Sequence, residues 1–215
     1  MKKLIKTKDN SYTFYSEKYN EAYHSTSGAL EESFKKFVEP CGIKAGMNIL
    51  DIGFGLGYNS GAAIQKAERI KIIALEKDIN IIREIPHIKV PYYFTGAYEI
   101  IRKAALHMGY RDGKVELNFL IGDARDTIKN ILTVKEENKF DAVFLDAFSP
   151  PKNPELWTVE FLREVYKRMK EGAILATFSC AGIVRRNLQE VGFEVKDGPA
   201  VGRRTPGTLA IKVPL

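Results

Sequence analysis

Four acidic residues follow short apolar runs of the chain, and each could bind a polar ligand: Asp51, Glu76, Asp123 and Asp146. A short apolar run is typical of a buried strand, and ligands of open α/β sheets bind at the carboxyl ends of the strands. Asp51 and Asp146 are therefore expected on neighbouring strand ends. A carboxylate there can accept hydrogen bonds from hydroxyls and amines, or take a proton from an amine.

A glycine loop separates the first of these strands from a helix. Gly53, Gly55 and Gly57 alternate with other residues after Asp51, and a helical pattern resumes at Tyr58. Glycine has no Cβ, so a ligand can approach the backbone, and the N–H groups that begin the helix face the same space. The spacing D-x-G-x-G-x-G resembles class I S-adenosylmethionine methyltransferases more than the G-x-G-x-x-G of a nicotinamide dehydrogenase. A structural turn without a ligand is the alternative.

Two of the acids suit a nucleoside. Glu76 ends the apolar run 70–75, about 20 residues after the glycine loop, where a carboxylate can accept from both ribose hydroxyls. Glu76 is preferred to Asp78 for this contact, and a solvated strand end is the alternative. Asp123 stands at a strand-to-helix junction, so it can cap the helix, lie beside an adenine amine, or do both.

Asp146 begins a stiff loop that could hold a reacting nucleophile. Pro150, Pro151 and Pro154 restrict its backbone, and a methyl transfer needs its reacting atoms nearly in line. An alkylamine is mostly protonated at neutral pH; an aspartate beside it can accept a hydrogen bond, orient the lone pair, and take up or pass on the proton. The alternative is a turn aspartate bonded to its own loop backbone.

The composition is that of an ordinary globular protein. The 215 residues are 45% hydrophobic and 28% charged, which suits one α/β domain. No apolar run reaches the ~20 residues of a membrane span, and the lysine-rich start lacks a signal-peptide core, so we expect a cytoplasmic protein without membrane contact. Cys41 and Cys180 are far apart with no His/Cys cluster, which disfavours a metal site. The net charge of +6 permits a polyanionic partner.

An α/β fold must position these residues. Hydrophobic periodicity and turn residues predict a Rossmann-like, doubly wound, mostly parallel sheet of seven strands with an antiparallel last hairpin. The expected strands are 48–52, 70–75, 115–121, 140–145, 172–178, 193–196 and 208–213, with a turn at 111–113. We expect a single domain over 1–215, in which 48–215 is the catalytic core. Residues 1–47 would form an N-terminal extension, with an antiparallel addition or lid in 1–23 and then a helix over the cofactor.

Several motifs together resemble the methyltransferase domain of the MnmC family. They are Ser27 to Glu32, Asp51 to Asn59, Gly122-Asp123-Ala124, Asp146 to Trp157, and Thr177 to Gly182 with Val184-Arg185-Arg186. They span nearly the whole chain, and the run Asp146 to Trp157 is close to family-specific. The resemblance implies methyl transfer from S-adenosylmethionine to the amine of 5-aminomethyluridine, commonly 2-thiolated, at the tRNA wobble position, giving 5-methylaminomethyluridine.

The resemblance also implies residue roles. Asp146 is the expected catalytic aspartate, Glu76 the ribose ligand, and Asp123 with Ala124 the adenine neighbours. The residues expected to contact the cofactor are Ser25, Glu31, Asp51, Gly53, Gly55, Gly57, Asn59, Glu76, Lys77, Asp123, Ala124 and Asp146. Those expected to contact the substrate, the anticodon arm of tRNA, are Phe148, Lys152, Asn153, Arg185, Arg186 and Arg203. No metal is expected, and the FAD-dependent oxidase half of two-domain members is not expected within these residues.

Two other functions remain open. One is a methyl- or aminopropyltransferase acting on a small-molecule amine, since polyamine synthases share the fold and an acid-rich loop. The other is a protein that binds RNA through its basic face and has lost the chemistry. The presence of all four acids argues against that loss.

Overall fold

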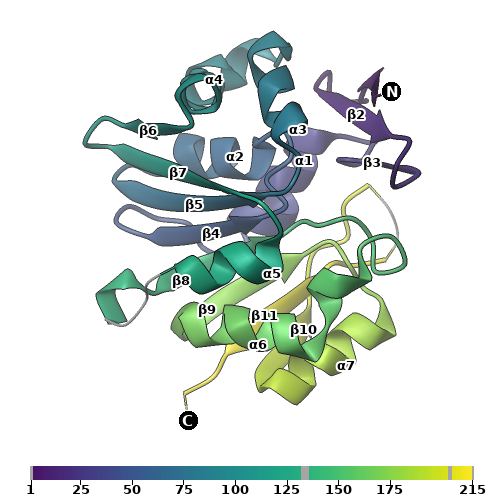
Figure 1. Ribbon diagram of the computed structural model, residues 1–215, viewed down its shortest axis with the longest axis vertical. Helices are drawn as coiled ribbons and strands as arrows, with labels where there is room; N and C mark the ends of the chain where they lie inside the picture. Colours follow the sequence, from purple (N-terminus) through teal and green to yellow (C-terminus); the bar gives the residue numbers. More distant parts are fainter. Residues whose placement is uncertain (1, 132–135, 203–204, 215) are drawn as a thin grey trace.

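The computed structural model describes residues 2–131, 136–202 and 205–214, and a sheet of eight strands lies at its centre (Figure 1). The strand order is β10-β11-β9-β8-β4-β5-β7-β6. The bounds are β4 Asn48–Ile52, β5 Ile70–Glu76, β6 Gly109–Arg111, β7 Val115–Ile121, β8 Phe140–Leu145, β9 Met169–Thr177, β10 Phe193–Asp197 and β11 Thr208–Lys212. The five strands from β9 to β7 are parallel, and β11, β10 and β6 pair antiparallel with their neighbours. The predicted mostly parallel α/β sheet is confirmed.

All seven expected strands are present, but the predicted count of seven is wrong because β6 adds an eighth at the edge. Gly109–Arg111 pairs antiparallel with β7, so Arg111 lies in a strand and not in the expected turn. Met108, at φ 57°, ends the preceding helix in the left-handed region and redirects the chain. So short an edge strand pairs through its backbone and leaves no alternating pattern in the sequence.

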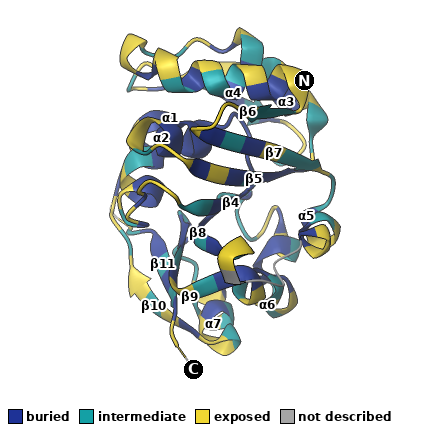
Figure 2. Ribbon diagram, turned by 90° about the vertical axis from the view of Figure 1, so that its left-hand side faces the viewer, coloured by how far each residue is buried: buried dark blue, intermediate teal, exposed yellow. Residues whose placement is uncertain are grey.

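Helices cover both faces of the sheet because successive strand side chains point to opposite faces. In β4, Ile49 belongs to one core cluster and Leu50 to the other. The first face carries α1 Ala29–Glu32, the π-helix η1 Ser33–Val38, α2 Tyr58–Lys66, α3 Ile79–Glu84 and α4 Thr95–His107; the second carries α5 Ala124–Thr127, α6 Val159–Arg168 and α7 Gly182–Val191 (Figure 1). The 3₁₀ turns are η2 Ile85–His87, η3 Tyr92–Phe94, η4 Ile128–Asn130, η5 Glu136–Asn138 and η6 Pro154–Trp157. In Figure 2 the central strands are mostly buried, and the flanking helices α4, α5, α6 and α7 show both buried and exposed residues.

A second, small sheet precedes α1. Its strands are β1 Lys2–Lys6, β2 Tyr12–Ser16 and β3 Glu21–Ala22, all antiparallel, so the antiparallel addition predicted for this segment is confirmed. The Tyr58 hydroxyl donates to Tyr12 O at 2.7 Å, and the backbone N–H and the hydroxyl of Ser149 donate to Glu21. These bonds hold the small sheet against α2 and against the loop after β8. The small sheet therefore lies at the carboxyl edge of the main sheet.

Gly57→Ala is expected to lower the free energy of unfolding by about 2 to 4 kcal/mol. Gly57 has φ +75°, and an added Cβ would lie 2.6 Å from Phe54 Cζ and 2.8 Å from Ile101 Cγ2. Urea unfolding followed by circular dichroism measures the change. The control is Gly96→Ala in α4, where an added Cβ meets nothing within 4 Å; there we expect a gain of about 0.5 to 1 kcal/mol. Equal effects of the two changes would contradict this account of the glycine loop.

Candidate active site

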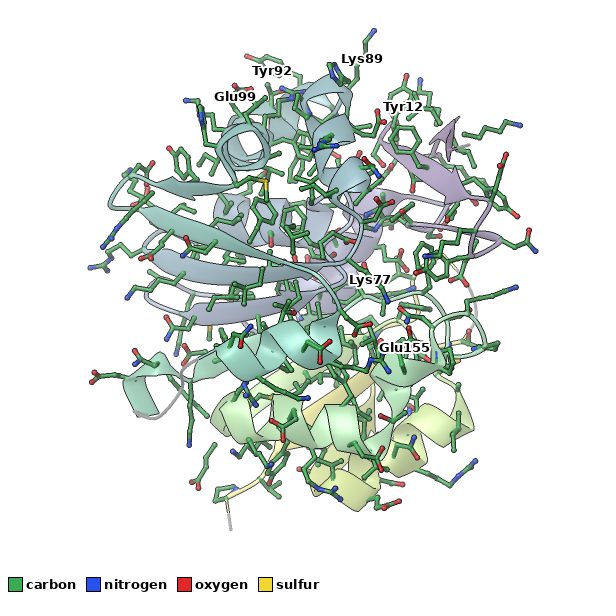
Figure 3. The ribbon with its side chains drawn as sticks, viewed as in Figure 1. Tyr12, Lys77, Lys89, Tyr92, Glu99 and Glu155 are labelled. Carbon is green, nitrogen blue, oxygen red and sulfur yellow. The ribbon has the colours of Figure 1, made fainter. Side chains whose placement is uncertain are left out.

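A cavity of about 890 Å³ opens at the carboxyl edge of the main sheet. Its wall comes from the loops that follow β4, β5, β7 and β8, and from residues 16–26 of the N-terminal segment. Figure 3 labels two wall residues from distant parts of the chain, Lys77 after β5 and Glu155 in η6. The cavity thus lies where ligands bind in open α/β sheets.

Gly53 lets two strand ends approach each other. It has φ +80°, and an added Cβ would lie 2.7 Å from the backbone oxygen of Asp146. The Asp146 N–H donates to Ile52 O at 2.9 Å, which fixes the start of the loop after β8 beside the loop after β4. Gly53 lines the cavity, whereas Gly55 and Gly57 do not. Gly53 therefore allows two backbone segments to approach, and Gly57 leaves room for the side chains of Phe54 and Ile101.

Glu76 lies in the cavity wall with both oxygens held by backbone groups. The Asp78 N–H donates to Oε1 at 2.7 Å, and the Gly55 N–H donates to Oε2 at 2.9 Å. Burial raises the pKa of Glu76, and the backbone hydrogen bonds oppose that rise. A carboxylate has about four lone-pair sites, so Glu76 can still accept a hydroxyl donor from a ligand.

Asp123 caps a helix and also faces the cavity. Its Oδ1 accepts from the Arg125 N–H at 3.1 Å, the geometry of an N-cap for α5. Hydrogen bonds from Arg125 and Lys77 hold the pKa of Asp123 well below its ordinary value. Because Asp123, Lys77 and Ala124 line the cavity, the capping role does not remove this carboxylate from the ligand site.

Asp146 lines the cavity, and its carboxylate is held from the side of the glycine loop. Asn59 Nδ2 donates to Oδ2 at 2.8 Å, and His24 Nδ1 lies 3.6 Å from the same oxygen. The side chain of Asp146 is 7% exposed. Asn59 is buried and does not line the cavity. Its hydrogen bond therefore positions the Asp146 carboxylate.

Three buried polar atoms near Asp146 have no hydrogen-bond partner in the described part of the chain: His24 Nε2, Asp51 Oδ1 and Asn59 Oδ1. Asp51 is fully buried, and the Ser60 hydroxyl donates to its other oxygen at 2.6 Å. Of the three residues only His24 lines the cavity. Because an unpaired buried polar atom is costly, His24 Nε2 is the atom of this cluster that a polar group of a ligand can satisfy.

Two adjacent glutamates differ in their place relative to the cavity. Glu31, an expected cofactor contact, does not line the cavity and pairs with Lys35. Glu32 lines the cavity together with Lys36, and Ser25 lies there too. Ala29, Leu30 and Phe37 are buried and mark the inward side of this helical segment. Their spacing is the sequence signal that separates an inward-facing Glu32 from an outward-facing Glu31.

The expected substrate contacts divide into two groups. Phe148 and Asn153 line the cavity, and the Phe148 ring stacks on Tyr19 with ring centroids 4.1 Å apart. Lys152, Arg185 and Arg186 do not line it; Lys152 and Arg186 are exposed, and Arg185 pairs with Asp197 at 2.6 Å. Arg203 lies outside the described residues. The stacking of Tyr19 on Phe148 was not predicted, because an aromatic residue in a short hairpin gives no spacing signal.

The described residues contain neither a helix that could span a membrane nor a side-chain cluster that could hold a metal ion. None of their helices combines the length and the apolar character needed to cross a bilayer. Nor do they contain a group of three or more His, Cys, Asp or Glu side chains arranged to hold a metal ion.

Comparison with known proteins gives relatives along the whole chain. Residues 91–213 match the family model described as S-adenosyl-L-methionine-dependent methyltransferase. The uncharacterized protein MJ0670 of Methanocaldococcus jannaschii is 34% identical over 98% of this chain and 60% of its own. The tRNA 5-methylaminomethyl-2-thiouridine biosynthesis bifunctional protein MnmC of Ralstonia nicotianae is 30% identical over 92% of this chain and 33% of its own. The chain therefore spans less than two thirds of either relative.

Solved structures agree with these sequence matches. MnmC2 from Aquifex aeolicus has a TM-score of 0.87 and 34% identity, with 100% of this chain and 72% of that chain covered. Spermidine synthase from Thermotoga maritima has a TM-score of 0.59 and 16% identity, with 94% and 69% covered. At that identity the second likeness concerns the fold alone.

Asp51→Asn is expected to change how stability depends on pH. Burial raises the pKa of Asp51 to about 7 in the folded protein, against about 3.9 in an unfolded chain. Between these values the folded state keeps a proton that the unfolded state has lost, so the contribution of this carboxyl to stability is full below pH ~4 and falls as the pH rises. The free energy of unfolding of the native protein minus that of Asp51→Asn should fall by on the order of a few kcal/mol from pH ~4 to ~7. Urea titrations across this range measure it, and a pH-independent difference would refute it.

Proposed function

The chain belongs to the family of S-adenosyl-L-methionine-dependent methyltransferases that contains the methyltransferase part of MnmC, and from this premise we propose that it methylates an amine on tRNA. The substrate would be 5-aminomethyluridine, commonly 2-thiolated, at the wobble position, and the product 5-methylaminomethyluridine. The observation that carries the proposal is the Asp146 carboxylate, which is held in the cavity wall beside the glycine loop. The relatives add support, since two are named MnmC or MnmC2.

The cavity fits the cofactor that the family requires. When bound, S-adenosylmethionine supplies a methyl group that its sulfonium already activates. Glu76 would accept hydrogen bonds from the ribose hydroxyls, and Asp123 with Ala124 would lie beside the adenine. His24 lines the cavity beside Asp146, and a polar group of the ligand could satisfy its unpartnered Nε2.

Asp146 would prepare the amine for attack. A protonated alkylamine donates to the carboxylate, which takes up a proton or passes it on and orients the freed lone pair. The bound cofactor would supply the methyl group and leave as a neutral thioether. The first product would be a secondary ammonium, which loses a second proton to solvent to give the neutral secondary amine. Asn59 fixes the Oδ2 atom during these steps, because its amide donates to that oxygen at 2.8 Å. Misplacement of the carboxylate would be costly to the rate.

The surroundings of Asp146 support a nucleoside substrate. Phe148 follows Asp146 by two residues, stacks on Tyr19, and meets Tyr23 edge-on at a centroid distance of 5.0 Å. Aromatic faces of this kind bind single-stranded bases by stacking. The net charge of +6 and the exposed side chains of Lys152 and Arg186 suit the phosphates of an anticodon arm. A tRNA substrate would also place the enzyme in the cytoplasm.

Asp146→Asn should reduce methyl transfer to tRNA carrying 5-aminomethyluridine by about 10²- to 10⁴-fold, because the amide cannot accept the proton. Nucleoside mass spectrometry of the tRNA measures the product. Calorimetry with S-adenosylmethionine should give affinity within a few-fold of the native value. The matched control is Asp126→Asn, whose side chain is 80% exposed and pairs loosely with Lys129 at 3.9 Å. Native turnover by Asp146→Asn with normal cofactor binding would eliminate the proposed role.

Competition separates the alternative functions. Excess tRNA that carries the aminomethyl group should inhibit labelling of the substrate, whereas free polyamines at the same amine concentration should not. Stronger inhibition by polyamines would favour a small-molecule amine transferase. Absence of heat with millimolar S-adenosylmethionine, in a protein that still binds RNA, would favour a binding protein without catalysis.

A further inference from the structure

Lys36 and Glu32 form a buried ion pair in the wall of the cavity. Lys36 Nζ lies 2.6 Å from Glu32 Oε1, and the two side chains are only 2% and 10% exposed. Both residues line the cavity, Lys36 from η1 and Glu32 from α1. The other oxygen of Glu32 accepts from the Ser25 N–H at 3.1 Å. The ammonium group is therefore fixed by a carboxylate that is itself anchored to the backbone.

The charged residues of the cavity wall are mainly acidic. Its acidic residues in the described part of the chain are Glu17, Glu21, Glu32, Glu76, Asp78, Asp123, Asp146 and Glu155. Its lysines there are Lys18, Lys36 and Lys77, and no described arginine lines it. Lys18 and Lys77 are exposed, and Lys77 is engaged by Asp123 at 2.8 Å. A negatively charged group of a ligand therefore finds its buried cation at Lys36.

Stability alone does not account for this pair. Removing two charges from water is expensive, and well-packed apolar residues in place of a buried pair are often as stable or more so. The ammonium of a lysine has three N–H donors, and Glu32 uses one of them among the described contacts. Donors that face the cavity can bind a ligand carboxylate, and the low dielectric of a buried site strengthens that bond.

We infer that Lys36 binds the α-carboxylate of the cofactor's amino-acid end and selects S-adenosylmethionine over its decarboxylated form. The carboxylate is the one anionic group of the cofactor, which otherwise carries a sulfonium and an ammonium that suit the acidic wall. The decarboxylated form lacks that group, and its transferable unit is an aminopropyl chain. By selecting the cofactor that carries a carboxylate, Lys36 favours methyl transfer over aminopropyl transfer. The inference rests on the cofactor of the family and not on the tRNA substrate.

Calorimetry of two ligands with the intact protein tests the inference without any catalytic assay. The native protein should bind S-adenosylmethionine about 10- to 100-fold more tightly than decarboxylated S-adenosylmethionine, the range expected for a hydrogen bond between charged groups. Equal affinities would overturn the inference. This comparison needs no variant, so a folding defect cannot obscure it.

A paired substitution locates the effect on Lys36. The double variant Lys36→Met with Glu32→Gln removes both charges, leaves no unpaired ion, and keeps an acceptor for the Ser25 N–H. It should lose about 10- to 100-fold in affinity for S-adenosylmethionine and keep its affinity for the decarboxylated form. The matched control is Lys114→Met with Glu68→Gln, which removes an exposed ion pair at 2.9 Å whose residues do not line the cavity. Equal losses for both ligands would assign Lys36 to structure and overturn the inference, whatever the tRNA assay shows.

Discussion

The structure depends on the close approach of two loops, one after β4 and the other after β8. Gly53 makes that approach possible, because any Cβ at this position would overlap the backbone of Asp146. The Asp146 N–H is bonded to Ile52 O, so the parallel ladder extends into the loop and sets the direction of the chain. Asn59, from the first turn of α2, then holds the Asp146 carboxylate. The Asp146 carboxylate is thus positioned by rigid elements that meet at one edge of the sheet.

The charges of the molecule are divided in a way that matches the proposed reaction. The protein is basic overall, yet its cavity wall is acidic. A cationic cofactor and a protonated aminomethyl group would both be attracted to such a wall, and the phosphates of RNA would be attracted to the outer surface. Lys36 is the buried lysine among the described lining residues, and in the proposed complex it would meet the anionic carboxylate of the cofactor. Methyl transfer from a sulfonium to an amine suits these surroundings.

The sequence was sufficient for the sheet and for the four strand-end acids, because buried parallel strands appear as apolar runs and their carboxyl ends converge. It was insufficient for β6, whose three residues pair through backbone groups alone. Glu31 and Glu32 both precede a lysine by four residues, and only the burial of their helix face separates them. The stacking of Tyr19 on Phe148 joins residues far apart in the chain, and no local pattern encodes it. Local patterns therefore predicted elements and strand ends, whereas contacts between distant segments required the fold.

The most direct measurement is a crystal structure of the complex with S-adenosylmethionine. The account predicts that the ribose hydroxyls bind Glu76, that the carboxylate of the amino-acid end binds Lys36, and that the methyl group faces the space beside Asp146. A cofactor bound in the opposite direction, with its adenine against Lys36 and its methyl group away from Asp146, would contradict the account.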